Sequence, residues 1–147
     1  MPGSRPRVDW PRLTPYVAIH ALALAALFEP VTATCLIVFG VTYVAKTFGA
    51  SAGYHRYFSH RAFRLSRFGQ FALACLACTS LQNGPLWWAA HHRVHHRRSD
   101  QDGDPHSPRQ GFWWAQVLWI FAHREKRLEE VRDLSRFPEL VWLDRFN

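Results

Sequence analysis

"LTPYVAIHALALAALFEPVTATCLIVFGVTYVAKTF", residues 13–48, has the character of a membrane-embedded segment, because Glu29 and Lys46 are its only charged side chains. A membrane-spanning helix needs about 20 apolar residues, so the stretch is too long for one such helix and short for two. Proline disfavours helix in the residue before it and suits the first turn of a new helix. The pattern therefore predicts a membrane-embedded helical hairpin that turns at Glu29 and Pro30.

The first arm of this hairpin, residues 13–28, would barely cross a membrane of ~30 Å at ~1.5 Å per residue. Trp10 and Tyr16 are suited to anchor it at the interface, or it crosses incompletely. A cleaved signal peptide is the alternative, but the apolar run continues well beyond the length of such a segment. Basic residues flank both ends of the hairpin, and the positive-inside rule places both ends in the cytoplasm. These residues are Arg5, Arg7 and Arg12 before it, and Lys46, Arg56, Arg61, Arg64 and Arg67 after it.

The rest of the chain is also expected to be helical, because it shows no alternating strand pattern and no repeat. We expect an apolar helix over 68–81, a break at Asn83-Gly84-Pro85, and a second helix over 86–98. A polar loop over 99–110, an aromatic helix over 111–123 and a charged, interfacial amphipathic tail follow; Trp113, Trp114 and Trp119 suit a membrane boundary. The prediction is an all-α protein with a cytosolic segment over 1–12, the membrane hairpin over 13–48, and a cytosolic or interfacial helical cap over 49–147.

The net charge of +7 and the three cysteines bear on two classes of protein, nucleic-acid-binding proteins and disulfide-stabilised proteins. The residues flanking the hairpin account for much of the charge, so we expect no nucleic-acid partner. An odd number of cysteines forms no disulfide framework and fits a reducing compartment. Cys75 and Cys78 lie one turn apart in the apolar helix, where they are expected to be small buried residues.

Histidines are concentrated in two short segments, "HRYFSH" at 55–60 and "HHRVHH" at 91–96. His92, His95 and His96 have the spacing i, i+3, i+4, which predicts three imidazoles converging on one helical face. His55 and His60 are about 140° apart around a regular helix. Either the helix therefore frays near these residues, or the two histidines point at different metals. The two clusters together predict metal binding.

The ligand types indicate which metal would bind. Arg93 and Val94 stand where the zinc-protease motif H-E-x-x-H has its glutamate, and no thiolate is nearby. A site rich in imidazole and poor in carboxylate favours iron, with copper and zinc as alternatives. Five imidazoles, with open positions needed for substrate and oxygen, favour two metal ions.

The segments "HRYFSH", "HHRVHH" and "DGDPHSPRQGFWW" resemble the histidine boxes of membrane fatty-acid desaturases of the Δ9 acyl-CoA or acyl-lipid type. The resemblance extends from about Trp10 to the C-terminus and implies a membrane protein whose cytosolic cap holds two irons. It implies that Gln82, Asn83 and Trp88 lie along an acyl tunnel, and that Asp102, Asp104 and His106 belong to a loop that supports the site. The iron ligands that it implies are His55, His60, His92, His95 and His96.

The resemblance also implies a reaction: a cis double bond is introduced into a saturated acyl chain, with O2 as co-substrate. The chain has no haem-attachment motif and too few cysteines for an iron-sulfur cluster, so the electrons must come from a separate protein. A ferredoxin or cytochrome b5-like donor would suit the cationic cytosolic face predicted for Arg61, Arg64, Arg67, Arg93, Arg97 and Arg98, which are equally suited to lipid headgroups. The implied substrate is a fatty acyl-CoA or an acyl-lipid in the membrane.

Three departures from the family pattern qualify this expectation. Ala90-His91 replaces an Arg-Asp pair common in acyl-CoA members, and Gln116 replaces a histidine usual in its helix. The family also continues into two more membrane helices and a third histidine box. We therefore expect the 147-residue chain to be a truncated form that is inactive by itself. The alternatives are a membrane diiron hydroxylase or ketolase, and a non-catalytic metal-binding remnant.

Overall fold

The computed structural model describes residues 8–122 and 127–146. Apart from one isolated bridge between Val8 and Ala122, these residues form helices and connecting loops. The all-α prediction is confirmed. Most of the cytosolic segment expected over residues 1–12, with Arg5 and Arg7, lies outside the described residues, as does His123.

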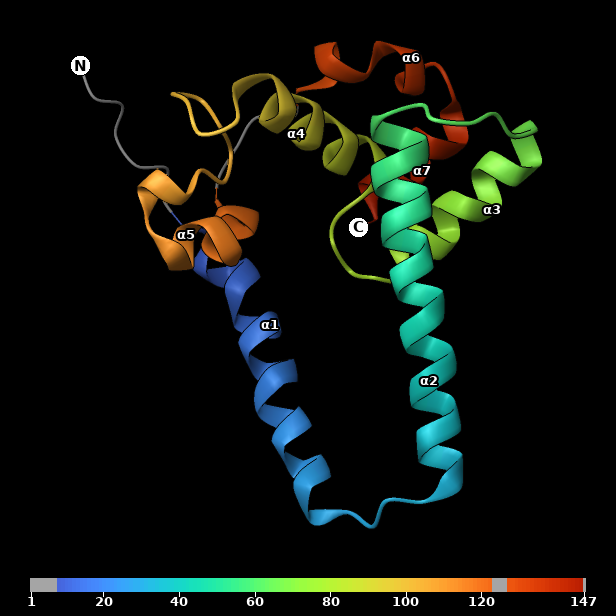
Figure 1. Ribbon diagram of the computed structural model, residues 1–147, viewed down its shortest axis with the longest axis vertical. Coiled ribbons are helices and arrows are strands. Elements are labelled where there is room, and N and C mark those ends of the chain that lie inside the picture. Colours follow the sequence, from blue (N-terminus) through green and yellow to red (C-terminus); the bar gives the residue numbers. More distant parts are fainter. Residues whose placement is uncertain (1–7, 123–126, 147) are drawn as a thin grey trace.

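Two apolar helical arms extend away from the rest of the molecule (Figure 1). The first is helix α1 (Trp10–Ala23), which continues as the 3-10 helix η1 (Leu24–Phe28), and the second is helix α2 (Ala33–Phe48). Glu29 has the extended backbone favoured before proline, and the Thr32 side chain accepts a hydrogen bond from the Cys35 N–H at the start of α2. The chain therefore turns at the residues predicted from the sequence.

Apolar side chains on both arms are exposed, as Leu22, Phe28 and Ile37 illustrate at 72%, 89% and 65%. One continuous helical stretch, Ala33–Ser59, is long and apolar enough to cross a membrane, whereas the apolar helix Leu13–Phe28 is shorter. These lengths agree with the unequal arms expected from the sequence. Insertion of both arms into a membrane stays a prediction.

Helix α2 continues without a break into a π-helix, η2 (Gly49–Ser59), which enters the cap. Helix α3 (Arg67–Cys78) packs against η2 at very short range. A Cβ atom at Gly49 would lie 2.8 Å from the backbone oxygen of Leu76, and one at Gly53 would lie 3.2 Å from the Ala77 Cβ. The missing side chains at these two glycines therefore allow the π-helix to sit directly on α3.

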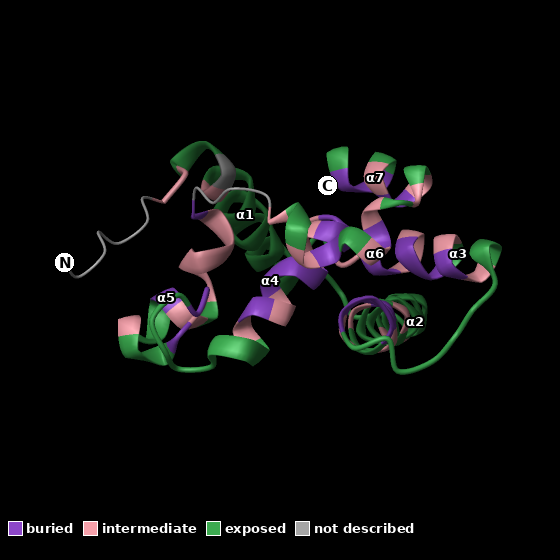
Figure 2. Ribbon diagram, turned by 90° about the horizontal axis from the view of Figure 1, so that it is seen from above, coloured by how far each residue is buried: buried purple, intermediate pink, exposed green. Residues whose placement is uncertain are grey.

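The core lies where η2, α3, helix α4 (Pro85–Arg98) and the C-terminal segment meet (Figure 2). The C-terminal segment comprises η5 (Leu128–Val131), α6 (Arg132–Ser135) and α7 (Pro138–Arg145). Its Val131, Leu134 and Leu140 are fully buried, in contact with a core that includes Tyr54 and Phe58. This segment therefore buries one apolar side against the protein, while Trp142 and Phe146 stay exposed, and its place at a membrane interface stays a prediction.

The aromatic helix predicted over residues 111–123 is broken into two short pieces, α5 (Phe112–Gln116) and the 3-10 helix η4 (Leu118–Phe121). Val117 between them has a non-helical backbone, with φ −134° and ψ −53°. The break lets Trp114 bury itself and donate to the Pro105 carbonyl, while Trp119 stacks on Trp87. Tertiary contacts of the two tryptophans therefore outweigh the continuity of the helix. Of the three tryptophans expected at a membrane boundary, only Trp113 is largely exposed.

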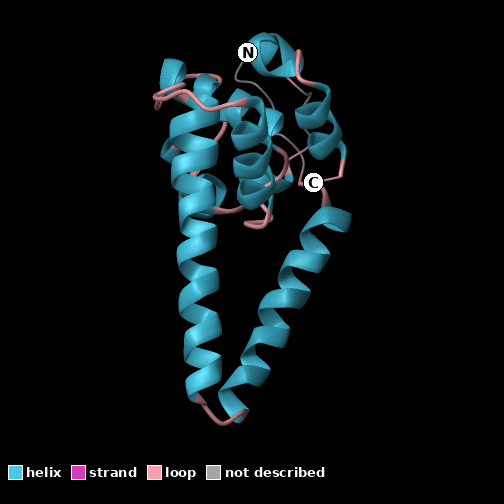
Figure 3. Cartoon of the chain, turned by 90° about the vertical axis from the view of Figure 1, so that its right-hand side faces the viewer, coloured by secondary structure: helices cyan, strands magenta, loops and turns pink. Residues whose placement is uncertain are grey.

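The side view in Figure 3 shows the two arms meeting at their turn and diverging toward the helical cap. At the cap end, α1 contacts η4, where the Asp9 N–H donates to the Phe121 carbonyl and the Tyr16 and Phe121 rings lie 5.2 Å apart. The opposite arm enters the cap through η2. This arrangement brings the last turns of η2 beside α4, and both carry the histidines.

Candidate metal centre

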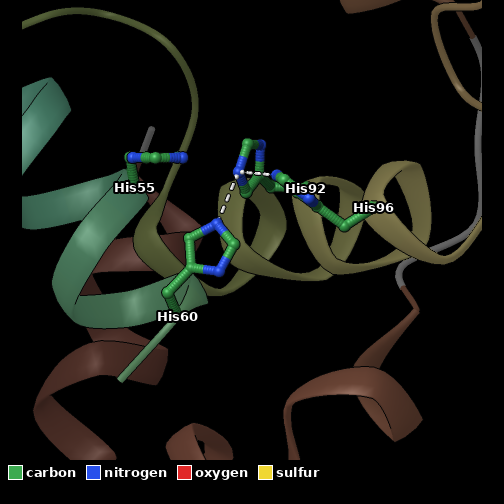
Figure 4. Close-up of side chains that lie close together, drawn as sticks. All are labelled: His55, His60, His92 and His96. Carbon is green, nitrogen blue, oxygen red and sulfur yellow. Dashed lines mark hydrogen bonds between the residues drawn. The ribbon is translucent and has the colours of Figure 1, made fainter. Parts of the chain in front are cut away.

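Four of the five predicted ligands form one cluster between η2 and α4 (Figure 4). His55 lies in η2 and His60 is the residue at its C-terminal end, whereas His92 and His96 lie one turn apart in α4. One nitrogen from each ring lies within 4.8 Å of the others. The structure therefore brings together imidazoles that are more than thirty residues apart in the sequence.

The π-helix explains how His55 and His60 share a face. A π-helix closes i→i+5 hydrogen bonds, so residue i+5 follows residue i after roughly one turn. The His60 N–H donates to the His55 carbonyl over 3.2 Å, and the two rings lie 4.6 Å apart. The alternatives of a frayed helix or of two histidines pointing apart were wrong, because both assumed the geometry of a regular α-helix.

The distances between donor nitrogens fit a bound cation. The Nε2 atom of His92 lies 3.2 Å from that of His60 and 3.0 Å from that of His96. An imidazole nitrogen has either one hydrogen or one lone pair, so His92 cannot form two good hydrogen bonds through this atom. Neighbouring ligands around an ion with metal–nitrogen bonds of ~2.1 Å lie roughly 3.0–3.4 Å apart. The spacing is thus that of nitrogens sharing one ion.

The electrostatic environment of His92 and His60 favours their neutral forms, as metal ligation requires. Burial, followed by repulsion from His96 and His55, lowers the pKa of His92 to about 3. Burial also lowers the pKa of His60, with further contributions from the neighbouring histidines and from Arg93. A lone pair on each of these two rings is therefore available at neutral pH.

His95 does not join this cluster, so the prediction that His92, His95 and His96 converge was wrong for one residue of the three. Consecutive residues are about 100° apart around an α-helix, so His95 and His96 diverge. His95 instead forms a second group with Asp104 and His106, whose candidate ligand atoms also lie within 4.8 Å of one another. The His95 and His106 rings stack at 4.0 Å.

Asp104 is the buried centre of this second group. Its carboxylate accepts hydrogen bonds from His95 Nδ1 at 2.9 Å, from the Asp100 N–H and from the His106 N–H. Burial raises the pKa of Asp104, but these hydrogen bonds outweigh burial and leave the pKa below its ordinary value. The ionised carboxylate therefore holds a hydrogen on His95 Nδ1 and leaves Nε2 as the donor for a metal. Asp102, the other acid predicted for this loop, is exposed.

An open cavity of about 610 Å³ adjoins the four-histidine cluster. His55 and His92 line it together with Gln82 and Trp88, and the Trp88 Nε1–H donates to Gln82 Oε1 over 3.1 Å. Asn83, the third residue predicted along an acyl tunnel, contributes its backbone carbonyl to the Tyr54 hydroxyl. Two of the three predicted tunnel residues thus lie at the cavity beside the histidines.

The predicted cationic face is partly neutralised by ion pairs. Arg61 and Arg93 contact Asp133, Arg67 contacts Glu139, and Arg97 contacts Glu130. Arg93 is the least exposed of these four, with 18% of its side chain accessible. Sequence reasoning missed its role, because its partner is 40 residues away and no local pattern indicates the pairing.

His106 was also missed as a close neighbour of a predicted ligand. The only sequence signal was its position two residues after Asp104, which placed it in the supporting loop but not against His95. His91 belongs to neither group of candidate ligands, and its buried ring stacks on Trp87 at 4.0 Å.

Comparison with known proteins identifies the family of this chain. A model of the fatty acid desaturase family matches residues 30–145. The sn-2 palmitoyl-lipid 9-desaturase of Nostoc sp. (strain 36) is 36% identical over 152 aligned residues, which cover 98% of this chain and 53% of that protein. Delta-9 acyl-lipid desaturase 2 of Arabidopsis thaliana is 34% identical over 145 residues, which cover 95% of this chain and 46% of that protein. The acyl-CoA C20 Delta5-desaturase of Anemone leveillei is 33% identical over 135 residues, 86% of this chain and 43% of that protein.

The chain thus spans about half the length of the curated relatives that it matches. The match nevertheless includes both histidine clusters and the loop that carries Asp104. The family predicted from the histidine boxes is confirmed, and the chain belongs to the fatty acid desaturase family.

Proposed function

We propose that this chain supplies the metal-binding part of an O2-dependent desaturase that introduces a double bond into a saturated acyl chain of a membrane lipid. The main support is the convergence of four imidazoles beside an open cavity, in a chain of the fatty acid desaturase family. The relatives named above are desaturases of acyl-lipids or of acyl-CoA. Two of the three act on acyl-lipids, which favours a lipid-bound substrate.

We assign two non-haem irons to the two groups of side chains. His55, His60, His92 and His96 would hold one iron, and His95 Nε2 would be the donor of this chain to the second. Bound iron would supply, with O2 and electrons from outside, the oxidising power needed to remove two hydrogens from an unactivated carbon–carbon bond. The role of Asp104 is to fix the orientation and tautomer of the His95 ring.

The protein contributes placement of the substrate. The cavity wall formed by Trp88 and Gln82 would hold one segment of the acyl chain against the face formed by His55 and His92. The hydrogen bond between these two side chains fixes the indole plane, which stacks on the His92 ring at 4.6 Å. Such a wall restricts which carbon atoms reach the site.

The proposed location is a membrane, with the cap on the cytoplasmic side. This placement is supported by the exposed apolar arms, by the length of Ala33–Ser59, and by the basic residues that flank the apolar stretch in the sequence. An external electron donor of the ferredoxin or cytochrome b5-like class would approach the cytoplasmic side. Arg64 and Arg98 are exposed there and suited to an acidic partner.

The experiment that tests this function joins the chain to the part of the Nostoc relative that it does not match, and expresses the chimera in a host lacking its own desaturase. Lipid extracts should contain monounsaturated acyl chains, and His92→Ala in the chimera should abolish them. The intact Nostoc relative is the positive control. Hydroxylated or keto lipids in place of double bonds would contradict desaturation, and product retained by the His92→Ala chimera would contradict the metal assignment.

A further inference from the structure

Arg93, between the ligands His92 and His95, uses every N–H of its guanidinium group. Nε donates to the Ser59 carbonyl over 3.1 Å, and Nη2 donates to the Phe58 carbonyl over 2.8 Å and to Asp133 Oδ2 over 3.0 Å. Nη1 donates to the Glu130 carbonyl over 2.8 Å and to Asp133 Oδ1 over 2.7 Å. Five donors thus meet five acceptors on two other segments of the chain.

Two of these acceptors are the last carbonyls of the π-helix. The three carbonyls before them, those of His55, Arg56 and Tyr57, accept hydrogen bonds from the backbone N–H groups of residues 60, 62 and 61. The carbonyls of Phe58 and Ser59 follow at the helix end, where backbone partners run out, and Arg93 supplies donors to both. The guanidinium therefore caps the helix end immediately before His60.

Asp133 contacts both Arg93 and Arg61. Its carboxylate pairs bidentately with Arg93 and lies 3.5 Å from Arg61 Nε. Arg61 follows His60 directly and has a left-handed backbone, with φ 54°, where the chain leaves the π-helix. His60 is thus flanked by a capped helix end on one side and a turn tied to Asp133 on the other.

We propose that Arg93 and Asp133 are positioning residues that set the place of His60 in the four-histidine cluster. The inference rests on the proposed metal centre for its purpose, although the contacts stand without it. Because Arg93 is adjacent to His92 on α4, the same side chain fixes the end of η2 relative to the helix that carries His92 and His96. The C-terminal segment, through Asp133 and Glu130, thereby takes part in forming the metal site.

Lysine cannot replace arginine in this role. An ammonium group has three donors around one nitrogen, whereas the planar guanidinium reaches carbonyls on one edge and a carboxylate on the other. The chain offers a matched control in Arg67, which pairs bidentately with Glu139 at 2.8 and 2.9 Å away from the histidines. Arg67→Lys removes a bidentate ion pair without touching the end of the π-helix.

The first experiment uses the full 147-residue chain in nanodiscs, titrated with Co²⁺ and followed by its visible absorption. Arg93→Lys should weaken Co²⁺ binding at the four-histidine cluster roughly 10–100-fold, the usual effect of removing a partner that orients a ligand. Arg67→Lys should leave it unchanged. His60→Ala combined with Arg93→Lys should bind as weakly as His60→Ala alone, because both changes remove the same ligand. Additive losses in the double variant would overturn the proposal.

The second experiment needs no metal and separates this inference from the proposed function. Amide hydrogen exchange at residues 60–62 should be faster in Arg93→Lys and in Asp133→Asn than in the unchanged chain, and unaffected in Arg67→Lys and Glu139→Gln. Unchanged exchange at these amides in Arg93→Lys would overturn the positioning role whatever the metal result. If the unchanged chain bound no Co²⁺ at the cluster, the proposed metal centre would fail, while the exchange data would still decide the role of Arg93.

Discussion

The Nδ1 atom of His95 donates a hydrogen bond of 2.9 Å to the buried carboxylate of Asp104, and this contact separates His95 from the other four predicted ligands. His96, the next residue, instead brings its Nε2 atom within 3.0 Å of that of His92. One short helical segment therefore supplies donors to two different groups. This division is the structural basis for assigning two metal ions.

Asp104→Asn should weaken binding at the second site roughly 10–100-fold and leave the four-histidine cluster loaded. An amide no longer enforces a hydrogen on His95 Nδ1, so the ring loses its fixed tautomer and orientation. Metal analysis of the chimera with the Nostoc segment, after gel filtration, should then show about one ion lost relative to the unchanged chimera. Asp102→Asn, in the same loop but exposed, is the control and should lose none. Equal losses in both variants would contradict the role of Asp104.

His92→Ala should remove the metal at the four-histidine cluster, because the His92 Nε2 atom lies within 3.0–3.2 Å of two other donors. The measurement is iron per chain after iron-replete expression and purification in detergent. His20→Ala is a suitable control, because His20 lies on α1 and its Nδ1 atom contacts the Tyr16 carbonyl. A fully occupied site containing zinc and no iron in the unchanged chain would refute the assignment of iron.

Gly49→Ala should destabilise the fold by about 1–3 kcal/mol, the usual effect of overpacking. The new Cβ would lie 2.8 Å from the Leu76 carbonyl oxygen and 3.0 Å from two backbone atoms of Ala77, none of which can rotate away. Gly40→Ala is the matched control on α2, because its Cβ meets nothing within 4 Å. Thermal unfolding in nanodiscs should show a lower midpoint for the first variant and an unchanged or higher one for the second.

Glu139→Gln tests the pH dependence of the ion pair that joins α3 to α7. Hydrogen bonds from Arg67 lower the pKa of Glu139 to about 2, against an ordinary value of 4.5. A depressed pKa in the folded state stabilises the fold above pH 4.5, and this contribution is lost as the pH falls toward 2. The unchanged chain should therefore be more stable than Glu139→Gln at pH 6, and the difference should shrink below pH 4.5.

The measurement for Glu139→Gln is urea unfolding across this pH range, at low and high salt, because salt screens an exposed pair. Glu129→Gln, an exposed acid of η5, should show no comparable pH dependence. A stability difference between the unchanged chain and Glu139→Gln that persisted at pH 2 would contradict the assigned cause.

Elements with local causes could be predicted from the sequence. The turn at Glu29 and Pro30, the break before Pro85, and the two helical arms follow from proline geometry and from apolar runs, which act within a few residues. Metal binding could also be predicted, because a metal site needs several imidazoles and the histidines are closely spaced in the sequence. The family followed from these same residues.

The grouping of the candidate ligands depends on tertiary contacts. His55 and His60 share a face because η2 is a π-helix packed on α3 through Gly49 and Gly53, a contact with residues more than twenty positions away. His95 leaves the cluster because the loop carrying Asp104 folds back onto it, and Arg93 meets Asp133 across 40 residues. Local patterns fix helices and turns, but the choice between an α-helical and a π-helical register depends on long-range packing and hydrogen bonds that form only when the segments meet.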